Sequence, residues 1–109
     1  MSFRLNGKTI TMTRGDTVRI GISLSDDEGS PYIPEEGDSI RFACKKTYDG
    51  DLLIEKDIPT DTLILKLEPE DTKPLSFGKY VYDMQITFAN GDVCTFVDKG
   101  QLKLTEEVD

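Results

Sequence analysis

The sequence contains no histidine and no tryptophan. Histidine is the commonest general base and metal ligand, so its absence excludes imidazole-based catalytic triads, histidine-ligated zinc and a proximal haem histidine within this chain. An enzyme built from these residues would have to rely on carboxylates, lysine or a cysteine thiolate. We therefore expect a protein that is not an enzyme, with no catalytic, metal-binding or cofactor-binding residue and no cofactor.

Basic residues are also few, since 13 Lys and Arg stand against 21 Asp and Glu and give a formal net charge of −8. Nucleic-acid binding depends on Lys and Arg that displace counterions from phosphates, so we expect no nucleic-acid partner. No run of about 18 apolar residues occurs, so no membrane span is expected. The first residues lack the apolar stretch of a secretory signal, and the chain is expected to stay in the compartment where it is made.

The 109 residues, 37% hydrophobic and 31% charged, match the size and composition of one folded domain. A single domain spanning residues 1–109 is therefore predicted.

Apolar residues recur at every second position along most of the chain, which is typical of β-strands with one buried face. Asn6-Gly7 and Asn90-Gly91 are signals for tight hairpin turns. A helical turn is expected only at 69–72, and residues 98–100 are expected to break the strand pattern. The expected strands are 3–5, 9–12, 17–24, 39–46, 52–58, 62–67, 79–88 and 93–97, with a last short strand around Leu102 and Leu104.

Short strands separated by turn signals predict an all-β fold, an immunoglobulin-like antiparallel β-sandwich of about 7–9 strands. Gly78-x-Tyr80 after a proline-containing turn resembles the tyrosine corner of such domains, where the tyrosine hydroxyl binds upstream backbone. On this mapping 17–24 is strand B, 39–46 strand C, 62–67 strand E, 79–88 strand F and 93 onward strand G.

The two cysteines, Cys44 and Cys94, then fall on opposite sides of strand F. Two strand spacings amount to about 9–10 Å, whereas a disulfide needs Cα atoms within about 7 Å. Their spacing also matches no CxxC motif. Free thiols are predicted, as suits a reducing compartment or a particle assembled in one.

Three short motifs have functional and structural interpretations, and the structural one is preferred for each. Arg14-Gly15-Asp16 is the integrin-binding tripeptide but also an ordinary turn. Ser76-x-x-Lys79 has the spacing of penicillin-binding enzymes, but glycine and a following strand place the two groups badly. The acidic end, 106–109, resembles a chaperone docking tag but is expected to be a frayed tail.

Two further groups of residues are weighed in the same way. The acidic segment 26–38 is expected to be a solvated loop, with a weak cation site as the open alternative, because its spacing does not fit a calcium loop. Tyr80 and Tyr82 could stack on carbohydrate if exposed. Because they share their stripe with Met84, Ile86 and Phe88, we expect them in the core.

A longer pattern resembles the immunoglobulin-like amino-terminal domain of phage baseplate upper proteins and related prophage tail-associated modules. The pattern covers nearly the whole chain and comprises Gly15-Asp16-Thr17, Gly37-Asp38, Ile40-Arg41-Phe42, Asp71-Thr72, Leu75, the string GKYVYDMQI at 78–86, the string NGDV at 90–93, Thr95, Gly100 and Leu102. In that family the domain anchors a longer protein in the tail. The chain ends at Asp109, so we expect an assembly part rather than a receptor-binding protein.

The resemblance implies a non-enzymatic structural module of a phage or prophage particle, made in the bacterial cytoplasm and then placed in the virion tail or baseplate. Its partners would be further copies of itself or neighbouring phage structural subunits, and an oligomer is possible. The alternative is a bacterial cell-surface immunoglobulin-like module that binds carbohydrate or protein, for which exposed Tyr80 and Tyr82 would be the sign.

Overall fold

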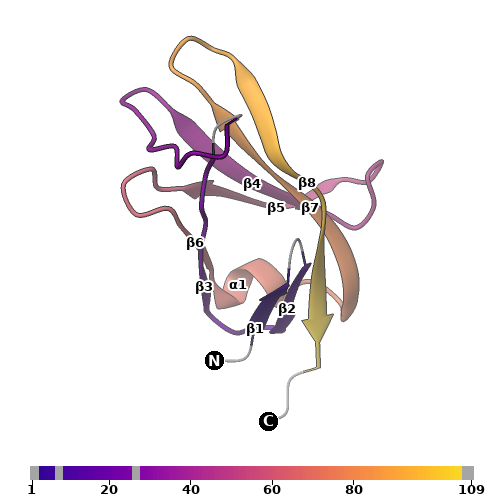
Figure 1. The fold of residues 1–109 in the computed structure, drawn as a ribbon. Coiled ribbons are helices and arrows are strands. Elements are labelled where there is room, and N and C mark those ends of the chain that lie inside the picture. The colour runs from indigo at the N-terminus through magenta and orange to yellow at the C-terminus, as the bar shows by residue number, and fades with distance from the viewer. Residues whose placement is uncertain (1–2, 7–8, 26–27, 107–109) are drawn as a thin grey trace.

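A computed structural model describes residues 3–6, 9–25 and 28–106, which form two β-sheets facing each other (Figure 1). The larger sheet has the strand order β1-β2-β8-β7-β4-β5, and the smaller sheet pairs β3 with β6. The elements are β1 (Phe3–Asn6), β2 (Thr9–Thr13), β3 (Val18–Gly21), β4 (Ser39–Lys45), β5 (Leu52–Ile58), β6 (Ile64–Leu67), α1 (Pro69–Thr72), β7 (Gly78–Thr87) and β8 (Val93–Thr105).

The predicted all-β sandwich is confirmed, and so is its strand mapping. The strands expected as B and E are neighbours, since β3 pairs with β6. The strand expected as F lies between C and G, since β7 lies between β4 and β8. One pairing differs from the antiparallel expectation, because β2 runs parallel to β8. The chain leaves β2 for the smaller sheet through a turn, where Arg14 N donates to Thr105 O at 3.1 Å.

The alternating apolar residues meet between the two sheets. Leu65 and Leu67 of β6 are fully buried against the larger sheet, and the Phe42 and Tyr82 rings lie 5.1 Å apart. Tyr80 and Tyr82 are each only 3% exposed, so both belong to the core as predicted. The described residues contain no helix long and apolar enough to cross a membrane.

The predicted break at residues 98–100 is wrong, because β8 continues through it to Thr105. Tyr82 pairs with Gly100 and Met84 with Val97, so Asp83 faces two residues of β8 rather than one. Such a β-bulge absorbs an extra residue without ending the strand. Lys99 takes a left-handed conformation, φ 56°, to accommodate it.

The smaller sheet is shorter than predicted at both strands. The expected strand 62–67 begins only at Ile64, because Leu63 has φ 55° and turns the chain. The expected strand 17–24 is β3 to Gly21, after which Ile22 N still donates to Leu63 O at 2.9 Å. Beyond the sheet, Leu24 O accepts from Tyr32 N at 2.9 Å, and Ser25 forms an isolated antiparallel bridge with Pro31.

The predicted tyrosine corner and helical turn are both present. Tyr80 Oη donates to Ser76 O at 2.7 Å. In the helical turn, Glu68 N donates to Asp71 Oδ2 at 2.8 Å, which completes a capping box at the start of α1. Thr72 at its end is fully buried, and its hydroxyl accepts from Gly15 N at 2.8 Å. These bonds tie α1 to the turn before β3.

The cysteines are free thiols on either side of β7, as predicted. Cys44 of β4 pairs with Tyr82, whereas Cys94 of β8 pairs with Ile86. Burial raises the pKa of the Cys44 thiol to about 12, while Cys94 is exposed.

Candidate functional site

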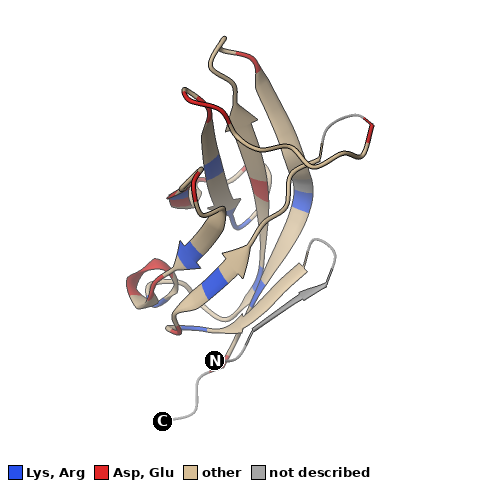
Figure 2. Ribbon diagram, turned by 60° about the vertical axis from the view of Figure 1, so that its left-hand side comes forward, with Lys and Arg blue, Asp and Glu red and all other residues tan. Residues whose placement is uncertain are grey.

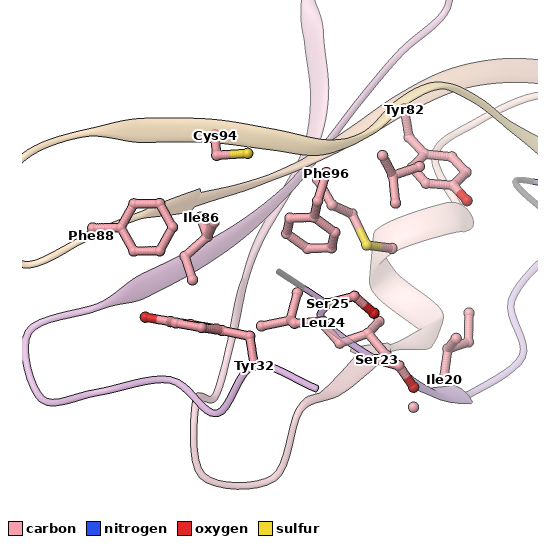
Figure 3. A pocket seen from close by; sticks show the side chains of 14 residues that line it. Ile20, Ser23, Leu24, Ser25, Tyr32, Tyr82, Ile86, Phe88, Cys94 and Phe96 are labelled. Carbon is pink, nitrogen blue, oxygen red and sulfur yellow. The ribbon is translucent and has the colours of Figure 1, made fainter. Parts of the chain in front are cut away.

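An apolar groove of about 820 Å³ lies between the two layers of the sandwich. One wall is the extended segment that begins in β3, and the other is the face of β7 and β8. Figure 3 shows Phe96 and Ile86 reaching from β8 and β7 toward Leu24 and Tyr32 on the opposite side. The lining residues are Ile20, Gly21, Ile22, Ser23, Leu24, Ser25, Tyr32, Tyr82, Met84, Ile86, Phe88, Cys94, Phe96 and Val97.

The groove follows from the unequal size of the two sheets. The larger sheet presents the apolar stripes of β7 and β8, but among the described residues the sheet that faces it consists of β3 and β6 alone. The hydrophobic side chains that pack on the core without being fully buried are mostly groove residues: Ile22, Tyr32, Phe88, Phe96 and Val97 line it, and Leu63 and Leu75 do not. The groove is therefore a part of the core that the smaller sheet leaves uncovered.

A loop braced by Asp38 contributes Tyr32 to the groove wall. The Asp38 carboxylate accepts from Tyr32 Oη at 2.6 Å, from Glu35 N at 2.9 Å and from Ala89 N at 3.1 Å. Tyr32 in turn packs edge-to-face on Phe88, with ring centroids 5.8 Å apart. The hydrogen bond to Asp38 raises the pKa of Tyr32 to about 12. The pKa of Asp38 is lowered, chiefly by this hydrogen bond and next by the one from Glu35 N.

The groove is lined by apolar side chains and by backbone, and none of its lining residues is Asp, Glu, Lys or Arg. Its polar side chains are the hydroxyls of Ser23 and Ser25, the Cys94 thiol, and the hydroxyls of Tyr32 and Tyr82. Among the residues the structure describes, no three His, Cys, Asp or Glu side chains gather where they could hold a metal ion. Burial raises the pKa of Tyr82 to about 12, so its hydroxyl stays protonated. Such a lining suits an apolar ligand or side chains of a partner.

A smaller hollow of about 300 Å³ lies on the opposite face of the larger sheet, beside the β8 bulge. Asp83 lines it together with Lys45, Tyr48 and Lys99. Asp83 Oδ1 is buried without a hydrogen-bond partner. The Asp83 side chain as a whole is only partly buried, and this hollow has less than half the volume of the groove.

The structure does not bring the motif residues together as sites. Arg14-Gly15-Asp16 is a turn, with Asp16 N donating to Thr13 O at 3.2 Å and Gly15 at φ 86°. Ser76 precedes β7 and Lys79 lies within it, so they do not share a helical turn. In the acidic segment Asp38 braces the loop, while Asp26 and Asp27 lie outside the described residues, as do the final residues 107–109.

Periodicity could not reveal the groove, because it tells which residues face inward and not which strands stand opposite them. One signal was available. Phe88 and Phe96 extend the apolar stripes past the length that a short partner strand can cover.

No protein-family model matches the chain, and neither the curated proteins nor the solved structures contain a significant match. The groove is therefore the feature of the molecule that bears on its function.

Proposed function

We propose that this protein is a non-enzymatic structural and assembly module of a phage or prophage particle, associated with its tail or baseplate, that acts through protein–protein contacts. The observation that carries the proposal is the apolar groove, where core side chains such as Phe96 and Val97 remain partly exposed. Contiguous exposed apolar surface of this kind marks interaction sites. The resemblance of residues 71–102 to tail-associated modules supports the choice of a phage particle.

The carbohydrate-binding alternative receives less support. It called for Tyr80 and Tyr82 to be exposed as a stacking platform, and both are buried. The groove is also lined mainly by aliphatic and aromatic side chains with few free polar groups, whereas sugar hydroxyls need hydrogen-bond partners.

Binding to tail proteins tests the proposal. The purified protein is mixed with the tail and baseplate proteins encoded beside it, and size-exclusion chromatography with light scattering measures the mass of any complex. We expect a complex that Phe96→Ser weakens at least tenfold, because Phe96 lines the groove. Leu53→Ser is the matched control, since Leu53 is an exposed apolar residue, 41% accessible, on β5. If the protein forms no complex with any of these tail proteins, the proposal is contradicted.

A further inference from the structure

The smaller sheet has an open edge along β3. Ile22 N donates to Leu63 O, and β3 pairs with β6 in the same register, Ile20 with Leu65. Backbone groups of successive residues in a strand point to opposite sides. Those of Ile20 and Ile22 therefore face β6, and those of Arg19, Gly21 and Ser23 face away from it. In residues 3–6, 9–25 and 28–106, no strand pairs with that second edge.

The larger sheet is open at the corresponding place. β8 pairs with β7 along its length, but β2 covers its other side only at Gln101–Thr105. The half of β8 from Val93 to Val97 therefore has a free edge within the described part of the chain. Val93 there is 58% exposed.

The groove lies between these two edges. Its β3-side wall consists of the consecutive residues 20–25, so backbone and side chains both line it. Gly21 is exposed, and a Cβ added to it would meet nothing within 4 Å. Space, unpaired backbone groups and an apolar floor thus coincide. An extended strand satisfies all three, because it bonds the edge and places every second side chain on the floor.

The charge around the groove indicates the chemistry of that strand. Glu35 N bonds to the Asp38 carboxylate, which also holds Tyr32 of the groove wall, and Asp92 O accepts from Phe88 N. The acidic residues Glu35, Asp38 and Asp92 therefore lie at the Tyr32–Phe88 end. Figure 2 shows acidic residues gathered in the loops. A second copy would bring the same net charge of −8, so a basic partner fits better.

We propose that the open edge of β3 takes up an extended strand of another protein, with apolar side chains at alternate positions and basic residues at the end nearest Asp38. The inference rests on the proposed function and specifies its contact. The added strand pairs with the backbone of Arg19, Gly21 and Ser23. Its inward side chains cover Phe96 and the other exposed core residues, and the smaller sheet gains a third strand.

A synthetic peptide tests the inference on the unmodified protein. The probe has about nine residues, with valine or isoleucine alternating with threonine and lysines at one end. Two control peptides are used: one with the same composition but its apolar residues contiguous, and one N-methylated at alternate backbone amides. Fluorescence anisotropy of the labelled peptides measures binding. We expect both controls to bind at least tenfold more weakly than the probe, and equal affinities overturn the inference.

Cys94 reports where the peptide binds. It lines the groove and is exposed, whereas Cys44 is buried, so a thiol reagent alkylates Cys94 first in the folded protein. Bound probe peptide should slow that alkylation at least fivefold at saturation. A peptide that binds without slowing it lies elsewhere and contradicts the inference.

Two substitutions at Gly21 test the backbone edge. Gly21→Pro removes the N–H that faces the open side without touching the bonds to β6, and Gly21→Ala retains it. We expect the proline variant to bind the probe at least tenfold more weakly than the alanine variant, with circular dichroism confirming that both fold. Should the proline variant unfold, the N-methylated peptide tests the same hydrogen bonds.

The same pair of variants separates this inference from the proposed function. If the two variants bind tail proteins equally well, the edge is not the contact although the assembly function stands. If the wild type binds the probe but no tail protein, the assembly function fails. Self-association that Gly21→Pro abolishes and Gly21→Ala keeps overturns the choice of another protein and assigns the edge to a second copy.

Discussion

At the residue scale, Gly100 is a position where the packing leaves no room for a side chain. A Cβ built on it would lie 2.5 Å from Cζ of Tyr82, the residue it pairs with across β7 and β8. Atoms cannot approach so closely, so Gly100→Ala must displace a buried ring. We expect a loss of about 1–3 kcal/mol in unfolding free energy, measured by urea denaturation.

The matched control for that substitution is Gly21→Ala in β3. It introduces the same methyl group into a strand, but nothing lies within 4 Å of the new atom. Its stability should equal or exceed that of the wild type, because alanine loses less backbone entropy than glycine on folding. Equal losses from both variants would mean that the Tyr82 ring is not the cause.

Tyr80 gives a second prediction at this scale. Its hydroxyl donates to Ser76 O, and removal by Tyr80→Phe leaves a partly buried carbonyl without that donor. We expect a loss of about 1–2 kcal/mol in unfolding free energy. Tyr48→Phe is the control, since the Tyr48 side chain is 58% exposed, and it should change stability by less than about 0.5 kcal/mol. A Tyr80→Phe variant as stable as its control would contradict the tyrosine corner.

At the scale of elements, the β8 bulge stores backbone strain in Lys99. A residue with a Cβ is disfavoured in the left-handed region by about 1–2 kcal/mol, and glycine is not. Lys99→Gly should therefore leave stability unchanged or raise it by up to about 1 kcal/mol, although glycine is normally costly in a strand. Thermal unfolding measures the difference. Gln101→Gly, two residues further along β8, should lower stability by about 0.5–1 kcal/mol.

The same bulge shows what the sequence could and could not predict. Alternation located β4, β5 and β7 within one or two residues of their ends, because each buries one face. Residues 98–100 have the composition of a turn, so their local conformational preferences predicted a break in the strand. Long-range pairing with β7 kept them in a strand. Alternation could not locate the groove for a related reason, since the groove arises where no described strand pairs with the second edge of β3.

The loop that carries Asp38 responds to pH. Its carboxylate binds Tyr32 and the backbone of Glu35 and Ala89, and these bonds lower its pKa. Because the pKa of Asp38 is lower in the folded than in the unfolded state, the carboxylate stabilises the fold at pH values above the unfolded-state pKa of 3.8. This stabilisation is lost as the pH falls through the folded-state pKa. Wild type should exceed Asp38→Asn in stability near neutral pH, and the gap should close as the pH falls below 3.8, because the wild-type carboxyl then becomes protonated. Urea unfolding of both proteins across this pH range measures the difference in stability. A difference that does not change with pH would show that the charge of the carboxylate is not its cause.

At the scale of the whole molecule, the net charge of −8 opposes folding, because the compact state brings like charges together. The ion pairs that relieve it, Arg41–Glu55 at 2.6 Å and Lys56–Asp71 at 3.1 Å among them, lie at or near the surface, where such pairs contribute about 0–1 kcal/mol. Repulsion should therefore outweigh pairing. Sodium chloride screens both, and its net effect should be a higher melting temperature.

The salt effect has a direction that substitutions can test. Glu35→Gln combined with Glu36→Gln lowers the net negative charge, so the rise in melting temperature between low and high salt should shrink. Lys73→Gln, at an exposed position, increases that charge and should enlarge the rise. Scanning calorimetry at matched protein concentration measures all three proteins. If salt instead lowers the melting temperature of the wild type, surface ion pairs outweigh the repulsion, and the acidic surface is then better explained by the folded state's own pairing than by a basic partner strand.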